Sequence, residues 1–296
     1  MDRDYDLFVR IIEGGSLSAA ARALRLSPAM VSKRLARLEE RLGAQLIRRT
    51  TRRLEPTQAG ARFYEAVSAI LTAAADAEAQ VAGRTRAVAG PLRLSAPTSF
   101  GRMHVAPLVA RFLDMHPHVR IELDLSDGFT DLVAERVDLA IRITASVPPS
   151  LAATRLATSR RILCTAPAYL AKHGPPARLA DLTQHRLLAA EGQLPWRLVR
   201  GGRPLTVQGE SIVGTNSSEV VRELALAGTG IALRSLWDVG PDLAAGRLVR
   251  VLEDVEGSAD VGIWAVHPRT PLVPAAVTAF TALLAEAFSP PAPWER

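Results

Sequence analysis

The sequence predicts a multidomain protein of α+β and α/β class: a winged helix-turn-helix, a long linker helix, and a larger domain in which strands and helices alternate. Three observations support this prediction. The 296 residues suffice for about two or three domains. Helical spacing of apolar residues dominates residues 7–82, whereas short strands alternate with helices from residue 92 onward. The excess of basic residues lies in the first fifth of the chain.

The distribution of charge indicates the partner of the N-terminal part. Residues 1–62 contain 13 Lys and Arg against 7 Asp and Glu, whereas residues 63–296 contain 23 of each kind. The formal net charge of +6 therefore belongs to the first segment. A basic module attached to a neutral body is typical of proteins that bind a polyanion such as double-stranded DNA. A basic face that only keeps the protein in solution is the alternative.

Residues 1–60 predict a winged helix-turn-helix. Two short helices are expected around residues 16–24 and 28–42, with a tight turn between them. Ser27 is a good N-cap for the second helix, and Pro28 takes the favoured first helical position. This second helix would lie in the major groove of DNA with its N-terminal residues nearest the bases.

A β-hairpin wing completes the expected DNA-binding module. Residues 46–54 have apolar ends around a basic centre, and the arginines of such a turn suit phosphates or a minor groove. Arg34, on the outer face of the second helix, is expected to reach a guanine edge. Solvated surface charge is the alternative for the whole set. The candidate DNA-binding residues are Ser27, Pro28, Met30, Ser32, Lys33, Arg34, Arg48, Arg49, Thr50, Arg52 and Arg53.

Residues 61–90 predict a linker helix followed by a hinge. Apolar residues recur at alternating spacings of four and three residues for nearly three heptads, which indicates a helix that joins two copies in a homodimer. The alternative is a helix packed on the core of its own chain. Residues 83–91 are expected to form the hinge. The seam consists of Phe63, Val67, Ile70, Ala74, Ala77 and Val81.

Residues 91–289 predict a domain of alternating strands and helices. Such βα units indicate a largely parallel sheet, with ligands at the carboxyl ends of the strands. The proline-rich residues 290–296 are expected to form a flexible tail. Strands are expected at residues 92–96, 119–125, 138–143, 161–166, 230–233 and 261–266.

Together these segments resemble the LysR-type transcriptional regulators. Over about sixty N-terminal residues the matching motifs occur in the right order and spacing, and further motifs match in the rest of the chain. The motifs that carry the resemblance are residues 14–21 (GGSLSAAA), 27–34 (SPAMVSKR), 42–49 (LGAQLIRR), 54–60 (LEPTQAG), 96–102 (APTSFGR), 138–142 (DLAIR), 166–170 (APAYL) and 244–249 (AAGRLV).

The resemblance implies a sequence-specific, DNA-binding transcriptional regulator that is not an enzyme. It also implies an effector domain of two α/β lobes, like a periplasmic binding protein, with a small-molecule effector in the cleft between them. Lobe I would comprise about residues 91–160 and 268–289, and lobe II about residues 161–267. The implied partners are promoter DNA, the effector, and further copies of the chain in a homodimer or homotetramer.

This chain departs from the family pattern in the recognition helix and in the cleft. Pro28 stands where the family often has Gln, and proline cannot make a bidentate contact to a base. Base reading then falls to later residues of that helix, with a contribution from DNA shape. Asn216-Ser217 stands in place of Asn-Gly, and Arg234-Ser235 in place of an apolar residue and Pro. The family's usual cleft chemistry is therefore not implied here.

Hydroxyl-bearing residues at two expected helix starts predict an effector site. Thr98-Ser99 and Asn216-Ser217 would face each other across the cleft, where hydroxyls and free N–H groups suit a carboxylate or another anion. Ordinary N-caps are the alternative. The candidate effector-binding residues are Thr98, Ser99, Phe100, Phe129, Arg142, Thr144, Pro195, Trp196, Asn216 and Ser217.

Several single residues have two interpretations. Arg142 is either a cation of the cleft or a surface charge at a strand end, and Trp196 is either a cleft wall or part of the core. Cys164 lies in an apolar strand, which favours packing over a thiol sensor. His116 and His118 have a metal-like spacing, but no cysteine or carboxylate cluster lies near them in sequence, so no metal site is expected.

The sequence excludes several classes of protein. The N-terminus lacks the pattern of a signal peptide, and no run of about 18 apolar residues occurs, so a cytoplasmic protein without a membrane partner is expected. A single cysteine excludes an intramolecular disulfide. No catalytic residue and no cofactor are expected, because no Ser-His-Asp or paired-carboxylate signature occurs. A small-molecule-binding protein or enzyme with a basic localisation domain is the alternative function.

Overall fold

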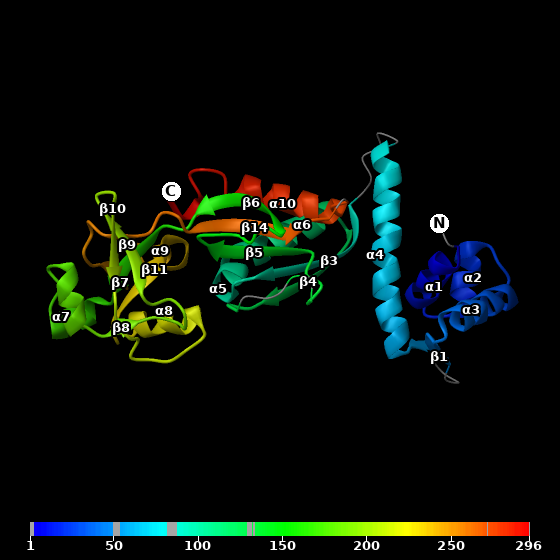
Figure 1. The fold of residues 1–296 in the computed structure, drawn as a ribbon, viewed down its shortest axis with the longest axis horizontal. Coiled ribbons are helices and arrows are strands. Elements are labelled where there is room, and N and C mark those ends of the chain that lie inside the picture. The colour runs from blue at the N-terminus through cyan, green and yellow to red at the C-terminus, as the bar shows by residue number, and fades with distance from the viewer. Residues whose placement is uncertain are drawn as a thin grey trace. The chain divides into compact units, whose positions relative to one another are not determined.

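The chain forms two compact units in a computed structural model that describes residues 3–49, 54–81, 88–128, 132, 134–270 and 272–295. The first unit comprises Met1–Arg86 and Leu272–Pro274, and the second comprises Ala87–Pro271 and Ala275–Arg296. Figure 1 shows the helices of the first unit in blue and cyan, and the sheets of the second in green to red. The expected boundaries at residues 60 and 90 remain predictions.

Three helices form the body of the first unit: α1 (Arg3–Gly14), α2 (Leu17–Leu24) and α3 (Pro28–Leu42). The Ser16 side chain caps α2 by accepting a hydrogen bond from the Ala19 N–H, and Ser27 caps α3 in the same way. Gly43, at φ 64°, ends α3 in the left-handed conformation that glycine tolerates. The predicted helix-turn-helix is confirmed, and these caps explain its boundaries. Its buried core consists of Leu7, Phe8, Ile11, Ala20, Ala21, Val31, Leu35, Leu38, Leu46 and Ile47.

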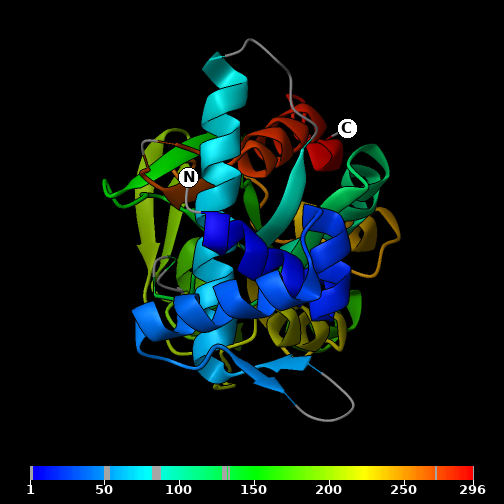
Figure 2. The same cartoon turned by 90° about the vertical axis from the view of Figure 1, so that its right-hand side faces the viewer.

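The predicted wing and long helix follow α3. Strand β1 (Ile47–Arg49) pairs antiparallel with β2 (Leu54–Pro56), and Figure 2 shows this hairpin below the helices. Helix α4 (Gln58–Val81) then begins next to Thr57, whose Oγ1 accepts from the Gly60 N–H and donates to the Gln45 carbonyl. Thr57 therefore joins the start of α4 to the chain that enters the wing.

Lobe I of the second unit is built on a five-stranded sheet with the order β4-β3-β5-β14-β6. Strand β3 runs parallel to β4 and β5, whereas β14 runs antiparallel to β5 and β6. Helix α6 (Ala106–Met115) and helix α10 (Ala275–Ala287) pack together through Phe112 and Phe280, whose ring centroids lie 5.0 Å apart. The strands are β3 (Ala89–Ala96), β4 (His118–Leu125), β5 (Leu139–Thr144), β6 (Leu151–Thr158) and β14 (Gly262–Pro268).

Lobe II is built on a seven-stranded sheet with the order β10-β9-β13-β7-β11-β8, and β12 also pairs with β7. The sequence-based prediction of a largely parallel sheet is wrong for this lobe. Among its strands β11 and β8 pair in parallel, and the other strand pairs are antiparallel. The strands are β7 (Arg161–Thr165), β8 (Leu187–Leu188), β9 (Trp196–Arg200), β10 (Arg203–Val207), β11 (Ile231–Ser235), β12 (Val249–Arg250) and β13 (Glu256–Gly257). The helices are α7 (Pro167–His173), α8 (Ser218–Leu226) and α9 (Leu236–Ala244).

The chain crosses between the lobes twice. The first crossing, between the end of β6 at Thr158 and the start of β7 at Arg161, is where the sequence predicted it. The return lies between Gly257 and Gly262, because β14 pairs with strands of lobe I over its whole length. The expected return near residue 267 was therefore wrong, and residues 262–267 belong to lobe I.

The tail expected to be flexible is instead packed on the second unit. Ala292 is buried, and Pro293–Glu295 form a short 3₁₀-helix. The Trp294 ring lies against His104 and Phe100, with centroid distances of 4.9 and 5.9 Å. Packing of the Trp294 indole among other rings removes a large apolar area from water, and this burial holds the proline-rich segment in place. Burial also lowers the pKa of His104 below its ordinary value, although the Trp237 carbonyl and Asp238 oppose this shift.

Candidate functional site

The outer face of α3 is basic and exposed. Val31 and Leu35 face the core, so residues on the opposite side of the helix project away from it. Met30, Lys33 and Arg37 follow one another at spacings of three and four residues and are exposed. Arg37 was missing from the sequence-based candidates, and its position four residues after Lys33 is the signal that could have found it.

Arg34 is held by a contact within its own unit. Its Nη2 and Nε both lie 2.6 Å from Asp4 Oδ1, and only 22% of its side chain and 19% of the Asp4 side chain are exposed. A contact from Arg34 to a base would require this ion pair to open. Ser27 and Pro28 lie at the start of α3, where Ser27 acts as the cap, and Ser32 is half-buried.

The wing carries the second group of candidate DNA contacts. Arg48 is exposed on β1 opposite Glu55, and Arg49 pairs through its backbone with Leu54. Glu39 Oε1 accepts the N–H groups of Leu46 and Ile47, at 2.8 and 3.1 Å, and so ties the wing to α3. The candidates Thr50, Arg52 and Arg53 lie outside the described residues.

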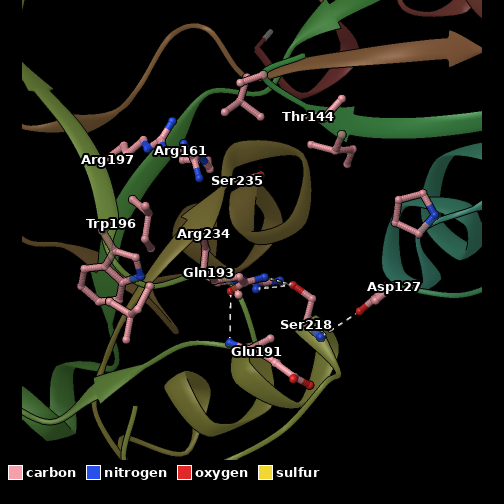
Figure 3. Close-up of a pocket in the computed structure, with 18 of the residues that line it drawn as sticks. Asp127, Thr144, Arg161, Glu191, Gln193, Trp196, Arg197, Ser218, Arg234 and Ser235 are labelled. Carbon is pink, nitrogen blue, oxygen red and sulfur yellow. Dashed lines mark hydrogen bonds between the residues drawn. The ribbon is translucent and has the colours of Figure 1, made fainter. Parts of the chain in front are cut away.

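A cleft of about 450 Å³ lies between the two sheets of the second unit (Figure 3). Five of the ten sequence-based effector candidates line it: Ser99, Thr144, Pro195, Trp196 and Asn216. Trp196 is buried and also forms part of the cleft wall, so its two interpretations both hold.

Four further candidates, Thr98, Phe100, Arg142 and Ser217, do not line the cleft. Thr98 contributes a backbone N–H to Asp127, and Ser217 caps α8 by accepting from Val220 N. Phe100 is fully buried against Trp237, with ring centroids 5.1 Å apart, because it follows Ser99 by a rotation of about 100° around the helical turn. Phe129 lies outside the described residues.

Arg142 is neither a cleft cation nor a surface charge. It is 8% exposed, and its Nη1 donates to Ser95 Oγ and to the Ile141 carbonyl, both at 3.2 Å. Burial lowers the pKa of this guanidinium, and the charges of Asp124 and Glu135 oppose that effect. The sequence could not show which side of the sheet this residue faces.

Two arginines that the sequence analysis missed form a basic wall of the cleft. Arg161 begins β7 and Arg197 lies on β9, and both side chains line the cleft (Figure 3). Arg161 is half-buried, and its Nε has no hydrogen-bond partner among the described residues. Burial lowers the pKa of Arg161, while Asp260 acts in the opposite direction. Arginine remains charged in proteins, so this wall presents positive charge to the cleft.

One carboxylate joins the two helix starts that the sequence placed across the cleft. Asp127 follows β4, and its Oδ1 accepts the Thr98 N–H of lobe I at 2.8 Å. Its Oδ2 accepts the Ser218 N–H at the start of α8 in lobe II, also at 2.8 Å (Figure 3). The expected facing arrangement is therefore present, and a side chain of the protein occupies it.

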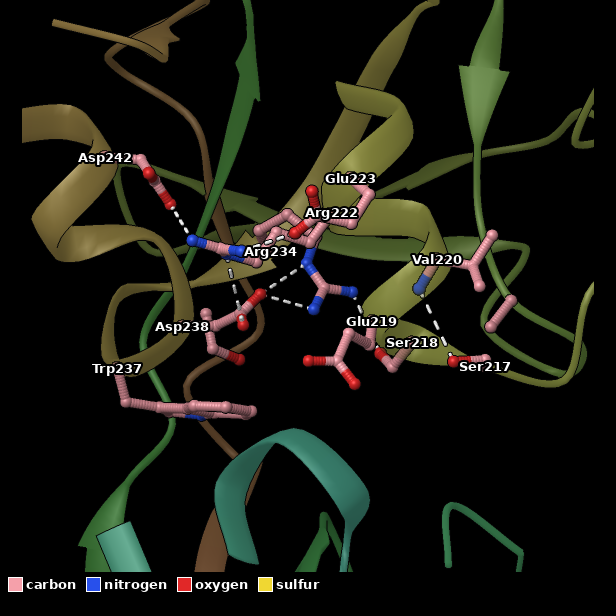
Figure 4. Close-up of polar contacts among 12 residues, drawn as sticks. Ser217, Ser218, Glu219, Val220, Arg222, Glu223, Arg234, Trp237, Asp238 and Asp242 are labelled. Carbon is pink, nitrogen blue, oxygen red and sulfur yellow. Dashed lines mark hydrogen bonds and ion pairs between the residues drawn. The ribbon is translucent and has the colours of Figure 1, made fainter. Parts of the chain in front are cut away.

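A buried ionic network supports the α8 side of the cleft (Figure 4). Arg234, 3% exposed, donates from Nε and Nη2 to Asp238, which is fully buried. Arg234 Nη1 also donates to Ser218 Oγ at 2.9 Å, and the Gln193 amide donates to the same oxygen at 3.0 Å. The departure from the family pattern at residue 234 thus provides the donor that positions Ser218.

Cys164 is inert packing material. It is fully buried in β7, and this burial raises the pKa of its thiol to about 12. The described part of the chain contains no cluster of three or more His, Cys, Asp or Glu side chains that could hold a metal ion. It also contains no helix that is both long and apolar enough to cross a membrane.

Family models match both units. The model described as "Bacterial regulatory helix-turn-helix protein, lysR family" matches residues 3–61, and the model "LysR substrate binding domain" matches residues 85–289. The chain belongs to the LysR family of transcriptional regulators. The predicted family, fold class and function are confirmed: this regulator joins a DNA-binding helix-turn-helix to a two-lobed domain that binds an effector. The family consists of transcriptional regulators.

Relatives and solved structures of similar length match this regulator. It is 38% identical to the transcriptional activator TtdR of Escherichia coli over 277 residues, which cover 91% of this chain and 87% of TtdR. It is 37% identical to the regulator DmlR of Escherichia coli strain K12 over 268 residues, covering 89% and 87%.

Two full-length structures have the same fold. The Vibrio cholerae virulence activator AphB matches with a TM-score of 0.61 and 27% identity, covering 97% of this chain and 99% of AphB. CrgA from Neisseria meningitidis matches with a TM-score of 0.59 and 30% identity, covering 97% and 98%.

Proposed function

We propose that this regulator binds promoter DNA as a homodimer and responds to a small organic anion bound in the cleft. The observation that carries the proposal is the basic wall formed by Arg161 and Arg197. Guanidinium groups are preferred partners of carboxylates because they can donate two parallel hydrogen bonds. The unpartnered Nε of the half-buried Arg161 favours a ligand with an acceptor at this position. Such an effector acts through its different affinity for two arrangements of the domain.

Helix α4 is proposed to join two copies through its second half. Val67 is buried within its own chain, and Phe63 packs on Tyr5 with ring centroids 5.4 Å apart. The first part of the seam therefore supports the intrachain alternative. Ile70 is 55% exposed and suits contact with a partner helix, whereas the side chains of Ala77 and Val81 are not described. A homotetramer made of two such dimers remains a prediction.

Replacing Lys33 or Arg37 by alanine is expected to weaken binding to promoter DNA by about tenfold and to lower the salt dependence by about one ion per variant if the side chain contacts a phosphate. The physical reason is that each exposed cation on α3 releases a condensed counterion on binding. Fluorescence anisotropy with the promoter beside the regulator's own gene, over a series of salt concentrations, measures both quantities.

The control for this prediction is Lys172→Ala, an exposed lysine on α7 in the other unit. This variant should bind DNA as the unaltered regulator does. If Lys33→Ala and Arg37→Ala also keep full affinity at every salt concentration, α3 does not present this face to DNA.

Replacing Arg161 by alanine is expected to reduce the affinity for an anionic effector by about tenfold or more, because a charge-assisted hydrogen bond is lost. A thermal-shift screen with sodium salts of small mono- and dicarboxylic acids identifies the anions that stabilise the regulator, and titration with those anions measures the loss.

Arg200→Ala is the matched control, because Arg200 lies on the same strand as Arg197 but pairs with Asp254 away from the cleft. It should leave anion binding unchanged. Equal stabilisation of the Arg161→Ala variant and the unaltered regulator by every anion would contradict the proposed basic site.

A further inference from the structure

Asp127 is the starting observation, because its single carboxylate connects the two lobes. The Thr98 N–H, at the first helical residue after β3, and the Ser218 N–H, at the first residue of α8, each donate to it over 2.8 Å. Backbone N–H groups in the first turn of a helix have no helical acceptor, so they need one from elsewhere. Asp127 supplies that acceptor to both lobes at once.

The surroundings of Asp127 favour negative charge. Helix α8 has nine residues, and its N-terminus carries the positive end of the helix dipole. Arg234 donates a hydrogen bond to Ser218 Oγ, and this contact holds the N-terminal residue of α8 in place. The Thr98 and Ser218 N–H groups that bind the Asp127 carboxylate are therefore oriented to bind the carboxylate of another anion at the same position.

Ser99 is an independent sign that this part of the cleft receives a ligand. Its side chain is 2% exposed and lines the cleft, next to Thr98 in the sequence. Its Oγ has no hydrogen-bond partner among the described residues. Buried hydroxyls are almost always hydrogen-bonded, so an unpartnered one on a cleft wall indicates an acceptor or donor brought by a ligand.

A second charged contact between the lobes, among the described residues, is weaker because it is exposed to solvent. Arg102 Nη2 lies 2.6 Å from Glu219 Oε1, but 56% and 33% of these side chains are exposed. Water and salt screen an exposed pair of this kind, and such pairs contribute little to stability. Asp127 is half-buried and accepts from two backbone groups whose positions are set by helices.

We propose that Asp127 is an internal counter-anion that ties Ser218 of lobe II to Thr98 of lobe I, and that the carboxylate of an effector displaces it from Ser218. The inference rests on the proposed anionic effector and specifies how that effector changes the domain. Loss of the hydrogen bond between Asp127 and Ser218 allows α8 to move relative to lobe I. The contacts that the effector makes with each lobe then determine the new arrangement of the two lobes. The regulator therefore responds only to anions that compete with its own carboxylate.

Chemical rescue tests this proposal without knowledge of the effector. Replacing Asp127 by alanine removes the carboxylate and leaves the Thr98 and Ser218 N–H groups without their acceptor, while Ser99 still lines the cleft. The melting temperature of the full-length Asp127→Ala variant should fall by about 5 °C. Sodium formate, whose single carboxylate replaces the missing one, should then raise this melting temperature relative to sodium chloride at the same ionic strength.

Formate should act on the unaltered regulator only at concentrations about tenfold higher or more, because the tethered carboxylate competes at a high effective concentration. Asp127→Asn is the matched control: its amide fills the same space, so formate should give no rescue. Glu219→Gln removes the other charged contact without opening the Asp127 position, and it too should show no rescue. Should Asp127→Ala fail to fold, Asp127→Ser provides the same test with a smaller loss of polarity.

Equal effects of formate on Asp127→Ala, Asp127→Asn and the unaltered regulator would overturn the proposal. The rescue requires neither DNA nor the basic wall, so it should persist in the double variant Asp127→Ala with Arg161→Ala. Failure of rescue thus rejects the role of Asp127 and leaves DNA binding and anion binding at Arg161 to be judged by their own experiments.

Discussion

Replacing Asp238 by alanine is expected to destabilise the second unit by about 3–5 kcal/mol, because it leaves the guanidinium of a buried ion pair without its partner. Arg234 and Asp238 are 3% and 0% exposed, and Arg222 lies 3.8 Å from the same carboxylate. The loss of Asp238 therefore uncovers positive charge where water cannot solvate it.

Urea unfolding followed by tryptophan fluorescence measures the loss of stability of the second unit. All four tryptophans of the chain, at positions 196, 237, 264 and 294, lie in the second unit, so their emission does not report on the helix-turn-helix. The double variant Arg234→Leu with Asp238→Leu should cost much less than Asp238→Ala, because it removes both charges together.

Arg178→Ala is the control, since Arg178 pairs with Asp181 on the surface with 79% of its side chain exposed. Its loss should leave the free energy of unfolding almost unchanged, because water screens an exposed ion pair. If Asp238→Ala costs no more than this control, the buried network does not stabilise the unit as argued.

Replacing Gly60 by alanine is expected to destabilise the helix-turn-helix unit by about 3 kcal/mol and to weaken DNA binding. A Cβ atom at this position would lie 1.9 Å from the Leu46 carbonyl oxygen, which is a backbone atom of the segment that enters the wing. Neither helix α4 nor the wing can relieve such an overlap by a change of rotamer. The wing must shift, and with it the arginines proposed to contact DNA.

The measurements are thermal unfolding by circular dichroism, in which α1 to α4 contribute strongly, and DNA binding by anisotropy. Gly43→Ala is the matched control in the same unit. Apart from Gly43 and its chain neighbours, no atom of the described residues lies within 4 Å of its Cβ position, so only the cost of a left-handed residue, about 1 kcal/mol, applies. A Gly60→Ala variant that unfolds and binds DNA as Gly43→Ala does would show that the two segments are not in close contact.

The DNA-binding part of this regulator could be predicted from the sequence because its determinants are local. Ser27 caps α3 by accepting a hydrogen bond from the Met30 N–H, only three residues away in the sequence. Pro28 takes the first helical position, which suits proline. The helical spacing of apolar residues, the basic turn of the wing and the location of net charge likewise depend on neighbours in the chain. Arg34 is the exception, since its partner Asp4 lies thirty residues earlier.

The effector cleft depended on contacts between distant residues. Asp127 binds N–H groups that lie 29 and 91 residues away in the sequence, and no periodicity records such a pairing. Phe100 and Arg142 were expected in the cleft because they lie at the ends of elements. In the structure the Phe100 ring instead packs on Trp237, and the Arg142 guanidinium donates a hydrogen bond to Ser95.

The sequence alone determined the helix-turn-helix, the wing, the long helix and the existence of two helix starts rich in hydroxyls, because capping, helical spacing and charge act over a few residues. Only the tertiary structure decided the antiparallel sheet of lobe II and the return of the chain between Gly257 and Gly262. It also decided that Arg161 and Arg197 line one cleft and that Asp127 contacts both lobes. The physical reason is that strand direction and side-chain burial follow from which segments pack together, and that choice involves the whole chain.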